Sequence, residues 1–235
     1  MMRLDKFLSD NTLFSRSEIK NLIKKGSVSV NGHMINSAEF KVVPETDNIS
    51  LNGECVIYKK FVYLMLNKPA GILSASNDKN RKTVVDLAPA EYKHYNLFPV
   101  GRLDKDTTGL LILTNDGDFA HKVISPKSNI EKSYIAVVDG SVTPDMITAF
   151  ASGVVLSDGT VCKPAILEKI TDTSARVIIT EGKYHQIKRM FGVVGLGVNA
   201  LHRERIGELQ LPDDLLPGNI YELNVNELRL ILPIL

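Results

Sequence analysis

Residues 101–109 (Gly-Arg-Leu-Asp-Lys-Asp-Thr-Thr-Gly) form a short polar segment that contains two aspartates, Asp104 and Asp106. Apolar runs at 97–100 and 110–113 flank the segment and are expected to be held as strands. Loops between rigid strands are where catalytic side chains are usually placed. We therefore interpret Asp104 as a carboxylate that acts as a nucleophile or a base.

Two metal-dependent alternatives fit parts of this segment. In a calcium loop that starts at Asp104, position 12 would be Asn115, where a bidentate glutamate is required. The Asp-x-Asp-x-Thr pattern of 104–108 is also similar to haloacid-dehalogenase phosphatases, which use a phosphorylated aspartate beside magnesium. Those enzymes need a further acidic pair, and the only candidate, Asp213-Asp214, falls in a proline-bounded turn. A solvated acidic turn is the non-catalytic alternative, and we expect no metal.

Several motifs occur in the order that one enzyme family shows. Gly-Arg-Leu-Asp at 101–104, followed by Thr-Thr-Gly-Leu-Leu-Ile-Leu, resembles the signature of RsuA/RluA-type pseudouridine synthases. Leu-Asn-Lys-Pro-Ala-Gly at 66–71 matches upstream, and Glu-Lys-Ser-Tyr at 131–134 matches downstream. Residues 181–191 and 201–207 resemble the branch that modifies bacterial small-subunit (16S) ribosomal RNA.

The resemblance implies a reaction without a cofactor, because turning uridine into pseudouridine moves the ribose bond from N1 to C5 with no net redox change. It assigns the catalytic carboxylate to Asp104; Asp106 is the alternative for that role but is expected to cap the loop. Tyr134 would pack against the target base and assist proton movement. Lys188 would pair with Asp104; it stands where many relatives have arginine, so the charge remains but the bidentate fork is lost. Arg189 is the alternative partner.

Other basic side chains near these motifs are expected to contact RNA. Arg102 matches a family residue that helps to hold the flipped nucleotide. Further RNA-contact candidates in this half of the chain are His185, Arg189, His202 and Arg203. The histidines lack the spacing of metal ligands on one face.

Length and composition are typical of a globular enzyme. The chain has 235 residues, 44% hydrophobic and 23% charged, which allows two hydrophobic cores. No apolar run approaches the roughly 18 residues of a membrane span and no signal peptide is legible, so we expect a cytoplasmic protein without membrane contact. Cys55 and Cys162 are isolated, so no disulfide or zinc site is predicted, and both are expected to be buried.

The net charge is only +1, but residues 1–25 carry six basic against three acidic side chains. Apolar residues at helical spacing predict two short helices, around 4–8 and 19–23, the second beginning after a serine cap at Ser15 or Ser17. The pattern then alternates at 27–30, and the following Asn-Gly pair predicts a hairpin turn.

This order resembles an αL-like S4 RNA-binding module, expected at 1–59, with the catalytic domain at 60–235. Its RNA-contact candidates are Arg3, Lys6, Arg16, Lys20 and Lys24. Spacings of four place Arg16, Lys20 and Lys24 on one helix face, where they would neutralise phosphates together.

The rest of the chain predicts an α+β fold with a mainly antiparallel sheet. Strands are expected at 61–66, 110–113, 134–138, 163–170 and 175–179, and helices at 118–124, 144–151 and 184–194. Thr143 is the expected cap of the second helix and Pro144 its first residue. The resemblance implies two halves that flank a central cleft.

The implied partner is ribosomal RNA, folded or in a small-subunit assembly intermediate, and we expect the protein to act as a monomer. Flipping a uridine costs least where it is unpaired, so a loop or bulge is the expected target. Two alternatives remain open: a large-subunit (23S) target, and a non-catalytic S4-type assembly factor that binds ribosomal RNA.

Overall fold

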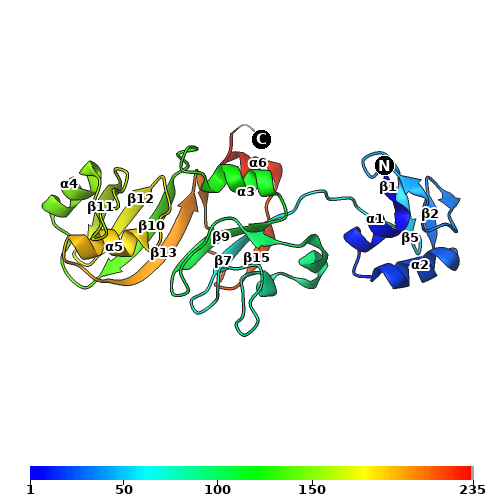
Figure 1. Ribbon diagram of the computed structural model, residues 1–235, viewed down its shortest axis with the longest axis horizontal. Coiled ribbons are helices and arrows are strands. Elements are labelled where there is room, and N and C mark those ends of the chain that lie inside the picture. Colours follow the sequence, from blue (N-terminus) through cyan, green and yellow to red (C-terminus); the bar gives the residue numbers. More distant parts are fainter. Residues whose placement is uncertain (234–235) are drawn as a thin grey trace. The chain divides into compact units, whose positions relative to one another are not determined.

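The computed structural model describes residues 1–233 and divides the chain into two compact units (Figure 1). The first unit comprises residues 1–62 together with 88–97, and the second comprises 63–87 and the chain from Phe98 onward. The sequence predicted a single boundary, between 59 and 60. The first unit ends three residues later and also takes in 88–97, a segment that no local pattern links to it.

The first unit packs two helices against a small antiparallel sheet. Its elements are β1 (Met2–Arg3), α1 (Leu4–Asn11), α2 (Arg16–Lys24), β2 (Val28–Val30), β3 (His33–Met34), β4 (Lys41–Val42), β5 (Ile49–Leu51), β6 (Glu54–Cys55) and the 3₁₀ helix η2 (Ala90–Tyr95). The sheet order is β3-β2-β5-β6, and β1 pairs separately with β4. The apolar stripes of α1 and α2 are buried in its core, as their spacing predicted.

Local signals explain how these elements begin and turn. α2 starts after Ser15, whose hydroxyl accepts from the backbone of Glu18 while the Glu18 carboxylate accepts from the backbone of Ser15. Asn31 and Gly32 both have positive φ, 52° and 81°, as the tight hairpin turn requires. One expectation was wrong: Cys55 is exposed, because it lies on β6 at the edge of the small sheet, whereas Cys162 is buried.

The second unit is built on one nine-stranded sheet. Along its main path the order is β11-β12-β10-β13-β9-β7-β15. The strands are β7 (Tyr63–Lys68), β8 (Phe98–Pro99), β9 (Thr108–Thr114), β10 (Lys132–Val138), β11 (Ile166–Thr171), β12 (Ser174–Ile179), β13 (Val198–Ile206), β14 (Leu209–Gln210) and β15 (Ile220–Glu222). The helices are η1 (Val85–Leu87), α3 (Gly117–Ile124), α4 (Pro144–Ser152), α5 (Gln186–Val193) and α6 (Val225–Arg229). Among the described residues each strand pairing in this sheet is antiparallel except β9 with β13, so the mainly antiparallel expectation is confirmed.

The expected elements are present with small shifts at their ends. Pro144 is the first residue of α4, as predicted, but the Thr143 side chain forms no capping hydrogen bond. The strand expected at 163–170 begins only at Ile166, since the chain before it follows an irregular path beside Glu181.

Gly109 allows the two halves of the sheet to meet. Its φ is +103°, and a Cβ there would lie 2.2 Å from the carbonyl oxygen of Arg203 and 2.7 Å from the Arg203 nitrogen. Only glycine permits so close a backbone approach. The parallel pairing of His202 with Thr108 and of Arg203 with Gly109 joins β13 to β9 directly after the aspartate loop.

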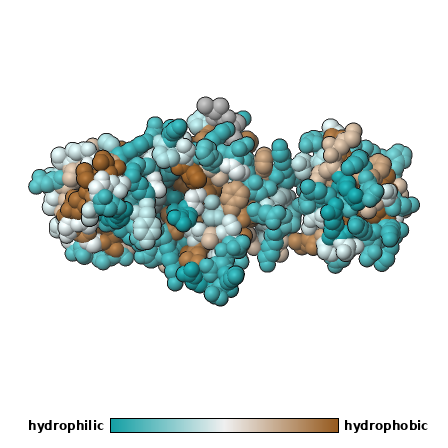
Figure 2. Space-filling model, in the orientation of Figure 1, coloured by the Kyte–Doolittle hydropathy of each residue, from teal (hydrophilic) through white to brown (hydrophobic). Residues whose placement is uncertain are grey.

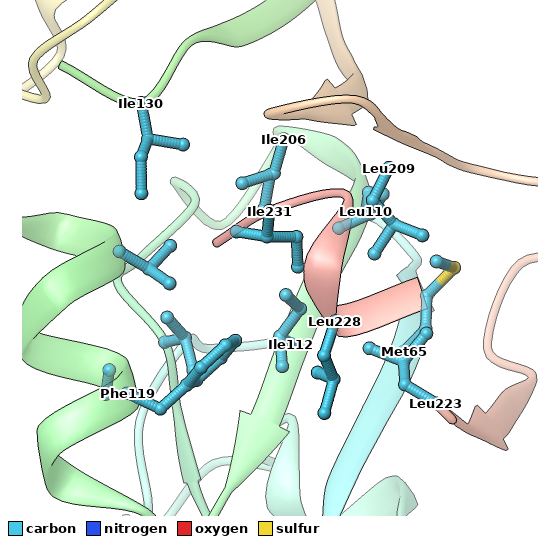
Figure 3. Packing of buried hydrophobic residues seen from close by; sticks show 13 residues of the cluster. Met65, Leu110, Ile112, Phe119, Ile130, Ile206, Leu209, Leu223, Leu228 and Ile231 are labelled. Atoms are coloured by element: carbon cyan, nitrogen blue, oxygen red, sulfur yellow. The ribbon is translucent and has the colours of Figure 1, made fainter. Parts of the chain in front are cut away.

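A hydrophobic core between the strands β7 and β9 and the helices α3 and α6 supports the base of this loop. α3 and α6 lie side by side over the strands (Figure 1) and contribute Phe119, Leu228 and the neighbouring Ile231, which converge on Met65 and Ile112 (Figure 3).

Hydrophilic residues cover most of the face seen in Figure 2. Within residues 1–233 no helix is long and apolar enough to cross a membrane.

Candidate active site

Lys68 holds the loop that carries Asp104, which connects β8 with β9. The Lys68 side chain is fully buried at the end of β7. Its ammonium donates to the carbonyl oxygens of Pro69 (3.1 Å), Asp104 (3.2 Å), Lys105 (3.2 Å) and Thr107 (2.9 Å). The loop thus wraps its backbone oxygens around one cation.

Burial lowers the pKa of Lys68 to about 8, although the charges of Asp106 and Asp104 act in the opposite direction. Lys68 falls within the 66–71 motif, but no separate role was predicted for it. The available signal was a lysine directly after four apolar or aromatic residues and an asparagine, at the end of a buried strand.

Two residues that follow β7, Gly71 and Ser74, also hold the loop. The backbone N–H of Gly71 donates to the carbonyl oxygen of Lys105 (2.8 Å). The Ser74 hydroxyl donates to the carbonyl oxygen of Leu103 (2.8 Å) and accepts from the Leu103 N–H (3.1 Å). The loop is therefore pinned on both sides of Asp104.

The Asp104 carboxylate lies between two basic side chains of the segment that begins α5. His185 Nε2 is 3.3 Å from Asp104 Oδ1, and Lys188 Nζ is 3.4 Å from Oδ2. The Asp104 side chain is 26% exposed and lines the pocket, so a ligand in the pocket can reach it. The structure brings Asp104 and Lys188 together, as the resemblance implied.

Lys188 lies closer to the second aspartate. Its ammonium donates to both oxygens of Asp106, at 2.6 and 2.8 Å, and this hydrogen bonding lowers the pKa of the Asp106 carboxyl. The sequence predicted a capping role for Asp106, whereas its carboxylate also faces Lys188 across the site. Arg189, the alternative partner, instead pairs with Asp158 at 2.6 Å.

A polar network shapes the turn before α5. Gln186 donates to Glu181 Oε1 (3.0 Å), and the backbone N–H of Lys183 donates to Gln186 Oε1 (2.9 Å). Burial opposes the charge on Glu181, but hydrogen bonds from Lys183 Nζ and the Lys163 N–H outweigh it and lower the pKa of that carboxyl. His185 adopts the left-handed conformation (φ 48°, ψ 34°), which is uncommon outside glycine and presents its ring to Asp104.

Tyr134 lines the same pocket and is supported by Arg203, its partner across β10 and β13. Arg203 Nη1 donates to the Tyr134 hydroxyl (3.3 Å), and Nε donates to the carbonyl oxygen of Leu110 (2.7 Å). Arg203 is only 4% exposed, and within the described residues its Nη2 has no hydrogen-bond partner. We expected Arg203 to contact RNA directly; burial behind Tyr134 makes it a support for the ring instead.

His202 lies on the other face of the sheet, because successive strand residues point in opposite directions. Its Nδ1 is 2.8 Å from the Thr108 hydroxyl, and burial lowers the pKa of its imidazole. His202 is not among the residues that line the pocket, and its contact with RNA stays a prediction.

The pocket is small and open, and all its walls belong to the second unit. It is lined by Arg102, Leu103, Asp104, Thr107, Tyr134, Ile179, Gly182, Lys183, His185, Gln186, Ile187, Lys188 and Leu201. Arg102 is exposed at this pocket, so its guanidinium is accessible to a ligand. Within the part of the chain described, no cluster of three His, Cys, Asp or Glu side chains could hold a metal ion.

The basic candidates of the first unit fall into two groups. Arg3 and Arg16 bind the buried Asp5, and their hydrogen bonds lower its pKa to about 2 although burial alone would raise it. Both arginines therefore have a structural role in addition to any contact with RNA. Lys6, Lys20 and Lys24 are exposed.

Comparisons of the sequence and of the fold with known proteins agree on one enzyme family. Residues 62–192 match the RNA pseudouridylate synthase family, and residues 2–48 match the S4 domain. The chain is 40% identical to ribosomal small subunit pseudouridine synthase A of Escherichia coli (strain K12), over 97% of this chain and 98% of that protein. It is 42% identical to the RNA pseudouridine synthase YtzG of Bacillus subtilis (strain 168), over 98% of each. A crystal structure of a pseudouridylate synthase superposes with a TM-score of 0.69 at 34% identity, covering 99% of this chain and all of that one.

Proposed function

Because the chain belongs to the RNA pseudouridylate synthase family, we propose that it converts one uridine of 16S ribosomal RNA to pseudouridine with Asp104 as the catalytic carboxylate. By resemblance to the small-subunit enzymes the target is uridine 516. The observation that carries the assignment of Asp104 is its position: a carboxylate at an open pocket, on a pinned loop, between His185 and Lys188.

The reaction requires an ionised carboxylate at a fixed place. The C1′–N1 bond breaks and a C1′–C5 bond forms. The proton on C5 is then removed and N1 gains a proton, which restores the conjugated uracil ring. Asp104 can attack C1′ as a nucleophile or remove a ribose proton as a base. Lys188 and His185 stabilise its negative charge within the pocket, and Lys68 keeps its backbone in place.

Tyr134 supplies a flat wall for the flipped uracil, and its hydroxyl is available for proton movement. The guanidinium of Arg203, which donates to the phenol oxygen, stabilises negative charge that develops there. Arg203 thereby acts through Tyr134 rather than on the RNA.

The S4 domain and the small-subunit activity named for the Escherichia coli relative support small-subunit ribosomal RNA as the substrate class. Lys6, Lys20, Lys24 and Arg102 are the exposed candidates for phosphate contact. We propose that the enzyme acts as a monomer in the cytoplasm, on folded RNA or a small-subunit assembly intermediate. A 23S target is the alternative.

The test maps pseudouridine by carbodiimide treatment and primer extension on unmodified 16S rRNA. Wild-type protein is expected to create one new stop, and Asp104→Asn is expected to create none while melting at the same temperature as wild type. The matched control, Asp106→Asn, should keep the stop. Stops with Asp104→Asn would move the catalytic role elsewhere, and a stop only on 23S rRNA would overturn the substrate assignment.

A further inference from the structure

Tyr184 is an exposed aromatic residue in the turn that leads into α5. All seven tyrosines lie in the described part of the chain, and Tyr184 alone is exposed, with 69% of its surface accessible. Within residues 1–233 its hydroxyl makes no hydrogen bond. A tyrosine that is exposed beside an active site is well suited to contact a ligand, because its ring offers a large, rigid face.

The ring is attached to the catalytic pocket by stacking. The rings of Tyr184 and His185 are stacked, with centroids 3.8 Å apart and planes inclined by 19°. His185 lines the pocket, and its Nε2 is 3.3 Å from Asp104. Tyr184 is therefore one ring layer beyond a side chain that touches the carboxylate.

We propose that Tyr184 is a stacking platform for a nucleobase next to the target uridine, an inference that rests on the proposed function. Unpaired RNA is commonly held by bases that stack on aromatic side chains, and this contact tolerates any base. The base, Tyr184 and His185 form one continuous stack that ends at Asp104. Arg102, exposed at the pocket, supplies positive charge for the phosphates of the same nucleotides.

The platform predicts a specific kinetic change on unmodified 16S rRNA. Tyr184→Ala is expected to raise KM about five- to one-hundred-fold, the usual effect of losing one base–aromatic stack. We expect kcat to stay within about two-fold, because Asp104, Lys188 and Tyr134 remain in place. Tyr184→Phe keeps the ring and should behave like wild type, which separates stacking from any role of the hydroxyl.

Binding can be observed without turnover, because the chain contains no tryptophan. Tyr184→Trp combined with Asp104→Asn places a single indole at the platform, and 16S rRNA should quench its fluorescence. The matched control is Ile170→Trp in the same Asp104→Asn background. Ile170 is 48% exposed on the edge strand β11, away from the pocket, so its indole should not be quenched.

The two measurements separate this inference from the proposed function. If the wild type makes no pseudouridine in 16S rRNA, the proposed function fails, while quenching on 16S and 23S rRNA still decides whether Tyr184 binds bases. An unchanged KM for Tyr184→Ala, or equal quenching of the two indoles, would overturn the platform. Loss of kcat in Tyr184→Phe would also overturn it.

Discussion

At the scale of single residues, two lysines approach Asp104 in different ways. Lys68 is buried and, within residues 1–233, donates only to carbonyl oxygens of the backbone, so it sets the position of the loop. Lys188 is 23% exposed and binds carboxylates, so it sets the charge balance of the pocket. A point-like ammonium can bridge Asp104 and Asp106, whereas the planar fork of an arginine suits a single carboxylate better.

We expect Lys188→Met to lower kcat about ten- to one-hundred-fold, because Asp104 loses the cation nearest to one of its oxygens. Single-turnover rates on 16S rRNA would measure the change. Arg189→Met is the matched control one residue away, since Arg189 pairs with Asp158. If the two variants were equally impaired, the effect would belong to the helix and not to the ion pair.

Lys68→Met is expected to reduce kcat by at least about ten-fold, because the loop around Asp104 loses its shared hydrogen-bond donor. Single-turnover rates on 16S rRNA would measure the change.

The same variant tests the lowered pKa of Lys68. Native Lys68 releases its proton near pH 8, and the unfolded chain does so near 10.5, so the unfolded state binds more protons between these values. The free energy of unfolding of the wild type therefore increases relative to that of the variant as pH rises through this window, by roughly 3 kcal/mol in total.

Urea unfolding of wild type and Lys68→Met at several pH values from 7 to 11 would check this linkage. Below about pH 8 the stability difference should be constant, since Lys68 is charged in both states. A difference that does not vary across the whole range would mean that burial does not perturb Lys68.

At the scale of elements, the junction between β9 and β13 decides where the site forms. The Asp104 loop lies at the end of β9 where this junction forms. The other edge of β13 pairs with β10, which places Arg203 opposite Tyr134. The close approach at Gly109 is therefore a requirement of the site as well as of the sheet.

Gly109→Ala is expected to destabilise the protein by more than about 3 kcal/mol, because the methyl group would overlap the Arg203 backbone at a positive φ. Thermal unfolding would measure the loss. Gly159→Ala is a suitable control: Gly159 also has a positive φ, 81°, but nothing lies within 4 Å of its Cβ position, so strain without a clash should cost about 1 kcal/mol. Equal losses would show that conformation alone, and not the strand approach, requires Gly109.

At the scale of the whole molecule, part of the proposed RNA contact lies outside the unit that carries the chemistry. The pocket is built entirely from the second unit, whereas the exposed lysines of α2 belong to the first. Changes in α2 should therefore affect RNA affinity and leave the chemical step intact.

The double variant Lys20→Gln/Lys24→Gln is expected to raise KM for 16S rRNA with little change in kcat. The slope of log Kd against log salt should fall by about 0.7 to 0.9 for each phosphate that the two lysines neutralise in the wild type. Filter binding at several salt concentrations would measure it, with Lys41→Gln, an exposed lysine on β4, as the control. An unchanged salt slope would mean that α2 does not face RNA.

Local sequence signals determined much of this protein. A serine cap at Ser15 or Ser17, the Asn31-Gly32 turn and the two apolar stripes were predictable because each depends on residues only a few positions apart. The types and order of the motifs were also sufficient to indicate Asp104 and the family.

Only the tertiary structure decided which side chains meet. His202 and Arg203 are adjacent in sequence, yet His202 contacts Thr108 on one face of the sheet and Arg203 contacts Tyr134 on the other. The pairing of β13 with β9 and β10 sets which face each residue occupies. The roles of Lys68 and Asp106 depend likewise on contacts across 36 and 82 residues. Such contacts form when distant segments pack, so patterns within a few residues do not contain them.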